Sequence, residues 1–294
     1  MDVRRRLVVA TQLRAALVVV ASALALPAAA QPVPEPSERS AMILKASEVA
    51  YLHELERLRK DKALNTDAAA LARVRAAAEP VIRAAPALRP ESRQWQWAAN
   101  VEARAEPVLY CLPGGRILVS TGLLDRVRPT AAELSALLAH AIAHALDGRE
   151  GDAAVAQFGA RREAGDADPN RGMARLGEIL LKLTLAEPQS PDAERAADTQ
   201  ALELMARAGL DPKTVLAAWR KVEAQSGLTP PSFPALHPAS PDRVAAMESQ
   251  LPAMAALYEQ ARQELNPATS PASPTPLRPR GPQKAPSGAT APPK

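Results

Sequence analysis

The sequence predicts a mainly α-helical protein with one short β region, an α+β fold class in which helices dominate. Glycine is scarce, at 13 of 294 residues, so long segments contain no helix breaker. Helix-start patterns, in which Ser, Thr or Asp precedes Pro, Asp or Glu, recur along the chain. Strand-like patterns occur convincingly only around residues 95–120. Because aromatic residues make up 3% of the chain, the core must consist mostly of Ala, Leu and Val.

The N-terminal segment, residues 1–30, has the pattern of a signal peptide. Four arginines precede an apolar run over residues 15–26, and three alanines at 28–30 provide a small-residue cleavage site. An uncleaved anchor is the alternative, although the run is short for a membrane span. We therefore expect a periplasmic protein, soluble or peripherally membrane-associated, without an integral membrane span after signal removal. Residues 31–40 are Pro-rich and polar, and we interpret them as a leader.

The net charge of +4 is concentrated at the two ends of the chain. Residues 1–30 carry +3 (four Arg, one Asp) and residues 266–294 carry +4 (two Arg, two Lys), which leaves −3 for residues 31–265. A basic groove for nucleic acid is therefore not indicated. Residues 266–294 hold nine prolines and little apolar surface, as is typical of a disordered tail. Cys111 is the only cysteine, so no intramolecular disulfide can form.

The first half of the chain predicts two helices and then a hairpin. Apolar residues recur at helical spacing over 41–62 and again over 66–83, where Pro80 bends or ends the second helix. Strand character follows at 95–97 and 108–111, and the turn at 113–115 leads into a strand over 116–120. This hairpin is either an ordinary packing element or the edge strand of a substrate cleft, to which an extended peptide could add.

The second half is almost entirely helical by the same criteria. A short helix opens at Thr121 and is separated from the next by Pro129. Two separate helices are expected at the end of the body, a short one bearing Arg243 and a last one from Pro252. The expected helices between them cover residues 130–147, the first half of 149–170, 171–185, 191–208 and 212–226, and a Pro-rich loop covers 227–239.

The helix over 130–147 carries the clearest chemical signal. Thr130 and Glu133 form a capping-box pattern at its start. His140 and His144 are four residues apart, so both imidazoles lie on one face and can share a metal ion. A zinc hydrolase motif reads His-Glu-x-x-His, with the Glu as general base. Here Ala141 occupies that position, so the metal-binding half of the motif is present and the base is absent.

A catalytic zinc site needs a third protein ligand. Glu194 is the best candidate, because it lies early in a separate helix that can cross the first. Asp198, one turn further along that helix, can accept the outer ring N–H of a ligand histidine and fix its tautomer.

Four blocks in the same order resemble a known family: LPGG followed by TGLL, then HAIAH, then SPDAERAADTQALELMARAGLDP, then HPASPDR. The chain is similar over about residues 40–250 to the zinc metallopeptidases that include HtpX, the CAAX prenyl proteases and the BepA-like periplasmic proteases, peptidase family M48. The resemblance implies a gluzincin-type metallopeptidase domain over residues 41–265, with a short β-hairpin or sheet edge beside the His-x-x-x-His helix. It implies one Zn²⁺ per chain, bound by His140, His144 and Glu194. It also implies polypeptide substrates or clients, outer-envelope proteins among them.

The resemblance assigns roles to two further residues. His237 lies in the family's His-Pro loop, where it either steadies an oxyanion or fills the open coordination position, the alternative being a loop histidine without contact to the site. Arg243 is either an active-site donor or a clamp on the last helices.

Ala141 departs from the family, whose Glu at this position is the general base. A methyl group cannot accept a proton, so we expect an exported metalloendopeptidase-like protein whose catalysis is impaired. Ala141 fits a natural pseudo-peptidase and a Glu-to-Ala inactivated form equally. The alternative function is a non-catalytic, chaperone-like module that binds peptides or envelope clients without cleaving them.

Overall fold

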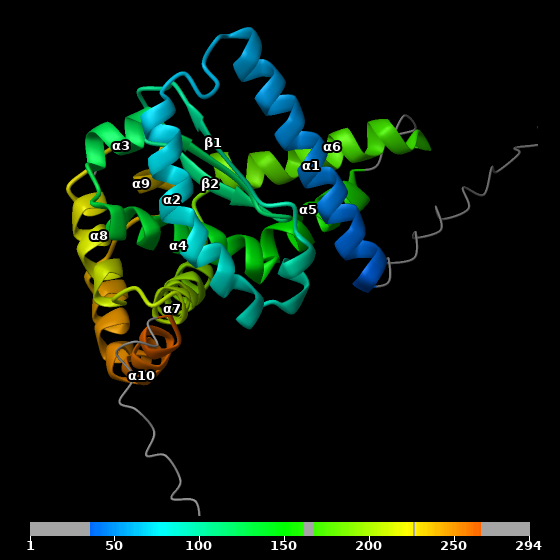
Figure 1. Ribbon diagram of the computed structural model, residues 1–294. Helices are drawn as coiled ribbons and strands as arrows, with labels where there is room; N and C mark the ends of the chain where they lie inside the picture. Colours follow the sequence, from blue (N-terminus) through cyan, green and yellow to red (C-terminus); the bar gives the residue numbers. More distant parts are fainter. Residues whose placement is uncertain (1–35, 162–166, 226, 266–294) are drawn as a thin grey trace, which may run out of the picture. The chain divides into compact units, whose positions relative to one another are not determined.

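A three-stranded sheet lies at the centre of the computed structural model, which describes residues 36–161, 167–225 and 227–265 (Figure 1). The strands β1 (Ala98–Glu102), β2 (Leu109–Leu112) and β3 (Arg116–Ser120) are arranged in the order β1-β3-β2. β1 is parallel to β3, whereas β2 and β3 form an antiparallel hairpin. The hairpin turn needs two positive φ angles, 85° at Gly114 and 81° at Gly115, which glycine adopts without strain.

The two faces of the sheet bury two separate hydrophobic clusters. Side chains alternate along β2, so Leu109 and Cys111 point into one cluster and Tyr110 and Leu112 into the other. The first cluster is shared with α2 (Ala68–Ala84), α4 (Ala131–Asp147), α7 (Pro191–Arg207) and α8 (Lys213–Glu223). The second is shared with α1 (Pro36–Lys60), α5 (Arg149–Ala160) and α6 (Pro169–Ala186).

Helix α4 is the most deeply buried of the helices around the first cluster, and it packs against α2, α7, α8 and β2 (Figure 1). Its start is fixed by the expected capping box, in which Thr130 and Glu133 exchange side-chain-to-backbone hydrogen bonds. Its end is Gly148, a left-handed residue with φ 82° whose N–H donates to the carbonyl of His144. Both ends are thus specified locally, and the burial of the residues between them fixes the rotation of the helix about its axis.

The remaining described elements are short or peripheral. Helix α3 (Thr121–Val127) follows β3 directly, and α9 (Phe233–Leu236) is a single turn inside the expected Pro-rich loop. Two 3₁₀ turns, Ala85–Ala87 and Pro90–Gln94, connect α2 to β1. Helix α10 (Pro241–Leu265) packs against α7 and α8. Among the described residues, no helix has the length and hydropathy needed to cross a membrane.

The mainly helical fold class is confirmed, but two expected elements are wrong. Trp95–Trp97 is not a strand: the two tryptophan rings pack together with centroids 5.3 Å apart, and the strand begins at Ala98. The last two expected helices are one, because α10 continues through Pro252. Buried residues on both sides of this proline, Met247 and Ala261, anchor the two halves of α10 and outweigh the missing N–H.

Other boundaries differ more modestly. The first helix spans 36–60 rather than 41–62, so residues 36–40 of the expected leader are helical. Residues 31–35, like the expected signal peptide at 1–30 and the expected tail at 266–294, lie outside the described residues. The second helix ends at Ala84 and contains Pro80 without a break.

Candidate metal centre

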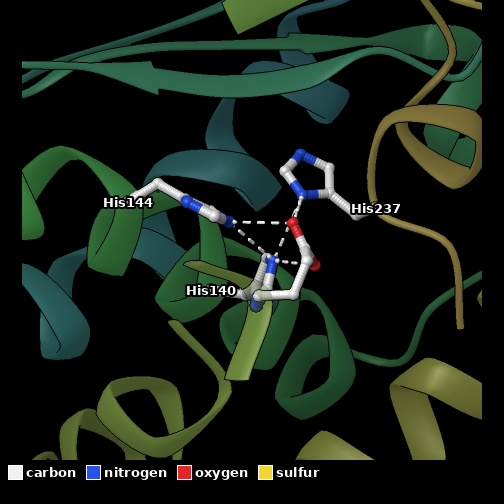
Figure 2. Close-up of side chains that lie close together, drawn as sticks. His140, His144 and His237 are labelled. Atoms are coloured by element: carbon white, nitrogen blue, oxygen red, sulfur yellow. Dashed lines mark hydrogen bonds and ion pairs between the residues drawn. The ribbon is translucent and has the colours of Figure 1, made fainter. Parts of the chain in front are cut away.

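Two imidazoles face each other on α4. His140 and His144 are one helical turn apart, and their Nε2 atoms are 3.1 Å from each other (Figure 2). Both side chains are almost fully buried, with 0% of His140 and 8% of His144 exposed. The i, i+4 spacing therefore produces the shared face that the sequence predicts.

Helix α7 supplies a carboxylate to the same point. Ser190 caps this helix and Pro191 occupies its first position, so Glu194 lies in the first turn, where α7 crosses α4. Glu194 Oε1 is 3.4 Å from His144 Nε2, and Glu194 Oε2 is 3.5 Å from His140 Nε2. The structure thus brings together the three residues that the sequence analysis selects as ligands.

His237 is the fourth member of the cluster. It follows α9, and its Nδ1 lies 2.8 Å from Glu194 Oε1 and 3.4 Å from His140 Nε2 (Figure 2). Its ring packs against Phe233, with centroids 4.6 Å apart. The alternative of a loop histidine without contact to the site is therefore wrong.

The four side chains fit one zinc ion. Their ligand atoms all lie within 4.8 Å of one another. Zn–N bonds of about 2.0–2.1 Å at tetrahedral angles separate neighbouring ligand atoms by about 3.3 Å, close to the separations of 2.8–3.5 Å found here. Glu194 Oε2 is buried and accepts no hydrogen bond of ordinary geometry, although Arg243 Nη1 lies 2.8 Å away. Imidazole nitrogens and a carboxylate are also the ligand types that zinc prefers.

Asp198 and Arg243 surround this cluster. Asp198 Oδ1 lies 3.1 Å from Nδ1 of His140, on the side of the ring opposite Nε2. Arg243 binds the Asp198 carboxylate through Nε and Nη2, and its Nη1 donates to the carbonyl of Pro238. Arg243 therefore contacts the site and clamps α10 to α7 at once, so the two roles considered for it do not exclude each other.

The protonation of the cluster follows from burial and from the carboxylates. Burial lowers the pKa of both His144 and His237, which leaves these rings neutral, as metal ligation requires. Burial also disfavours the charged form of His140, but Asp198 and Glu194 outweigh it and raise the pKa of this ring. Burial disfavours the charged form of Glu194 as well, and the three histidines, His237 foremost, nevertheless hold its pKa far below the usual range.

The space beside Ala141 is small. Its methyl group is 4% exposed and lines a cavity of about 10 Å³, together with residues of β2 and the rings of His144 and His237. That volume accommodates about one water molecule. A carboxylate also lines this cavity, that of Glu150, which accepts a hydrogen bond from Thr184.

No role is assigned to Glu150 or to Thr184 from the sequence. The available signal was Gly148, because a glycine that ends a helix in the left-handed conformation also reverses the chain. The residues just beyond such a reversal return toward the last turn of the helix, which here bears His144. Thr184 comes from α6, and its position depends on helix packing that no local pattern reports.

A helix bearing His-x-x-x-His, crossed by a second helix that supplies a glutamate, defines the metal centre of a zinc metallopeptidase. The profile of Peptidase family M48 matches residues 68–251, more than half of the chain. The chain belongs to this family, whose members use zinc, and the resemblance inferred from its motifs is confirmed.

Three curated relatives are mitochondrial metalloendopeptidases named OMA1. Identity is 28% over 160 residues with the Schizosaccharomyces pombe protein, 26% over 189 with that of Saccharomyces cerevisiae and 28% over 170 with that of Arabidopsis thaliana. These matches cover 53%, 57% and 53% of this chain, but only 47%, 50% and 31% of the respective relatives. The chain thus spans half or less of the length of the relatives it matches.

Proposed function

We propose that this protein is a zinc metalloendopeptidase-like protein in which His140, His144 and Glu194 hold one Zn²⁺ and peptide-bond hydrolysis is impaired. The observation that carries the proposal is the convergence of these three side chains, with His237, at one buried point. Membership of the M48 family supports polypeptides as the substrate class.

The protein's own residues divide the work of such a site. Zinc, when bound, polarises a water molecule or a peptide carbonyl. His140 and His144 would hold the ion through their Nε2 atoms, and Asp198 lies beside the outer nitrogen of His140, where it can fix the orientation of that ring. Ala141 has no group that can take a proton from the attacking water or pass one to the leaving amine. Loss of a general acid–base typically costs about 10²–10⁴ in rate, which is the impairment we expect.

His237 supports the same proposal. Its Nδ1 lies 2.8 Å from Glu194 Oε1 and 3.4 Å from His140 Nε2, so it fits a fourth coordination position at the same point. The cavity between His237 and β2 has a volume of about 10 Å³, too small for a peptide.

The second candidate is a peptide- or client-binding module that does not cleave. Ala141 favours it, because an intact metal and peptide site without a base would retain its ligand. Co-purification of undigested polypeptides with the zinc-loaded protein supports this candidate, whereas slow cleavage of the same polypeptides supports the impaired enzyme.

The proposed cellular location of the protein, and with it the proposed clients, rest on the sequence pattern alone. The arginine-rich, apolar segment at residues 1–30 supports export to the periplasm, where outer-envelope proteins would be the clients. The relatives named above are mitochondrial by name, so they give no support to a periplasmic location.

The test combines metal analysis with a cleavage assay in one preparation. We expect one zinc per chain in the unaltered protein and in the control His53→Ala, which removes an exposed histidine of α1. His140→Ala should lose the metal. Casein should be cleaved very slowly or not at all by the zinc-loaded protein. Equal zinc content in the His140→Ala and His53→Ala variants would refute the metal site, and rapid casein cleavage would refute the impairment.

A further inference from the structure

Each histidine of α4 has a carboxylate beside its outer ring nitrogen, but the two carboxylates differ in origin. Asp198, beside His140 Nδ1, belongs to the motif shared with the family. Glu150 Oε1 lies 3.8 Å from Nδ1 of His144 and belongs to none of the motifs that carry the resemblance. The two carboxylates thus lie on the same side of their respective rings, at 3.1 Å and 3.8 Å, although they come from unrelated parts of the sequence.

The fold holds Glu150 in place from two directions. The chain reverses at Gly148, with φ 82°, so α5 starts at Arg149 and Glu150 lies in its first turn. From α6, Thr184 donates a hydrogen bond of 2.8 Å to Glu150 Oε2. The Glu150 side chain is 11% exposed. One carboxylate oxygen is thus anchored, which leaves the other directed at the histidine.

The geometry distinguishes two possible roles for this carboxylate. Glu150 approaches the Nδ1 side of the His144 ring, whereas Nε2 of the same ring points at Glu194 and His140. A replacement for the base missing at Ala141 would have to face the metal side. Glu150 also lines the cavity beside Ala141, but its side-chain contacts are with Thr184 and the Nδ1 side of His144, so the geometry favours a role through the histidine.

We propose that Glu150 is a positioning residue for His144, a role that rests on the metal site proposed above. Its carboxylate accepts a hydrogen bond from Nδ1–H, which fixes the tautomer with a free Nε2 lone pair and orients the ring toward the point where the ion would bind. The distance of 3.8 Å exceeds a hydrogen bond. The adjoining cavity of about 10 Å³ leaves room for Oε1 to rotate inward while Thr184 retains Oε2.

The test measures zinc affinity by competition with a chromophoric chelator. Glu150→Leu removes every acceptor and should weaken zinc binding about 10–100-fold, the usual cost of losing such a partner. Glu150→Gln keeps a carbonyl acceptor and should retain an intermediate affinity. Asp152→Leu is the matched control: it removes a carboxylate from the same helical turn that is 60% exposed and pairs with Arg39. We expect this control to bind zinc as the unaltered protein does.

A double-variant cycle separates positioning from a general structural effect. A His144→Ala background retains His140, Glu194 and His237 as ligands, so a weaker zinc affinity can still be measured there. In this background Glu150→Leu should cause no further loss of affinity, because the residue through which Glu150 acts is gone. An equal loss in both backgrounds would overturn the proposal. So would a Co²⁺ absorption spectrum that Glu150→Leu leaves unchanged, since a displaced ring alters the ligand field.

Two further outcomes keep the test decisive. If Glu150→Leu does not fold, Thr184→Val releases the carboxylate more gently and should weaken zinc binding by a smaller factor; wild-type affinity in both Thr184→Val and Glu150→Gln would overturn the proposal. If His140→Ala loses zinc while a folded Glu150→Leu binds it normally, the role of Glu150 alone is wrong. If His140→Ala binds zinc normally, the metal site itself is wrong.

Discussion

Arg243 donates two hydrogen bonds of 2.8 Å to the carboxylate of Asp198, one from Nε and one from Nη2. The remaining nitrogen, Nη1, lies 2.8 Å from Glu194 Oε2, and the guanidinium lies 4.3 Å from the centre of the Trp219 ring. The buried guanidinium of Arg243 therefore contacts the proposed ligand Glu194 and also Asp198, the carboxylate beside the proposed ligand His140. It also joins the start of α10 to α7, so the last described helix is held against the helix that carries Glu194.

Breaking this pair should destabilise the metal-free protein strongly. Arg243→Leu leaves two buried carboxylates without their cation, a type of change that costs about 3–5 kcal/mol in free energy of unfolding. The control Arg262→Leu removes an exposed arginine of α10 that pairs with Glu259 at 3.7 Å, and such pairs contribute about 0–1 kcal/mol. Urea denaturation followed by circular dichroism measures both, and equal midpoints for the two variants would contradict the clamp.

Restoring a carboxylate at position 141 should have opposite effects on stability and activity. Ala141→Glu adds bulk and charge beside a cavity of about 10 Å³ that Glu150 already lines, so the metal-free protein should lose about 1–3 kcal/mol. Saturating zinc should recover this loss, because the ion binds the folded state only.

The zinc-loaded Ala141→Glu variant should cleave casein about 10²–10⁴ times faster than the unaltered protein. Ala141→Gln is the matched control, since it has the same shape but no base, and it should gain nothing. Equal rates for the Glu and Gln variants, both folded and zinc-loaded, would show that Ala141 is not what limits the reaction.

Removing the His237 side chain should leave zinc bound by the other three ligands and free the fourth coordination position. His140, His144 and Glu194 remain in His237→Ala, so equilibrium dialysis should still find one zinc per chain, bound more weakly. Because His237 fits the fourth position, the combined Ala141→Glu and His237→Ala variant should cleave casein faster than Ala141→Glu alone. A slower double variant would instead indicate that His237 takes part in the reaction.

Glu133, at the start of α4, gives a prediction on pH dependence. Burial disfavours its charged form, but hydrogen bonds from Lys221 and Thr130 outweigh it and lower the pKa of Glu133 from 4.5. A folded-state pKa below the unfolded value stabilises the protein above the unfolded pKa, and this contribution disappears as pH falls through the folded pKa.

Glu133→Gln keeps a capping-box acceptor but loses the ion pair with Lys221, so it should cost about 1 kcal/mol at pH 7 and progressively less as the pH drops below 4.5. Denaturation at pH 7 and pH 3 measures the difference. Glu248→Gln, which removes a half-exposed carboxylate 3.7 Å from Arg220, is the control and should show little change. A cost that is the same at both pH values would contradict the assigned pKa direction.

The fold class and the helices that carry the proposed ligands were predictable from local patterns, and the family resemblance supported the expectation that these ligands converge. His140 and His144 share a face because a capping box and a terminal glycine define one uninterrupted helix. Glu194 follows a Ser-Pro helix start, so it had to lie near the beginning of a separate helix. The sequence itself shows that both histidines of the His-Glu-x-x-His motif are retained, at 140 and 144, while the glutamate is replaced by Ala141.

Features that depend on packing were not predictable in this way. The Trp95–Trp97 segment has the composition of a strand, yet its two tryptophan rings pack on each other. The strand begins at Ala98 instead, where β3 provides a hydrogen-bonding partner. Pro252 predicts a break that the contacts of α10 with α7 override. Glu150 reaches His144 only because the chain reverses at Gly148 and α6 supplies Thr184.

The proposed ligands join segments that are distant along the chain, since His140 and His237 are 97 residues apart. An ion held by both would act as a reversible cross-link that closes most of the second half of the domain into a loop. At a free zinc concentration 100 times the dissociation constant, such binding adds about 2.7 kcal/mol to the folded state. The lifetime of this protein against other proteases would then rise and fall with the zinc supply of its surroundings, whether or not it cleaves anything itself.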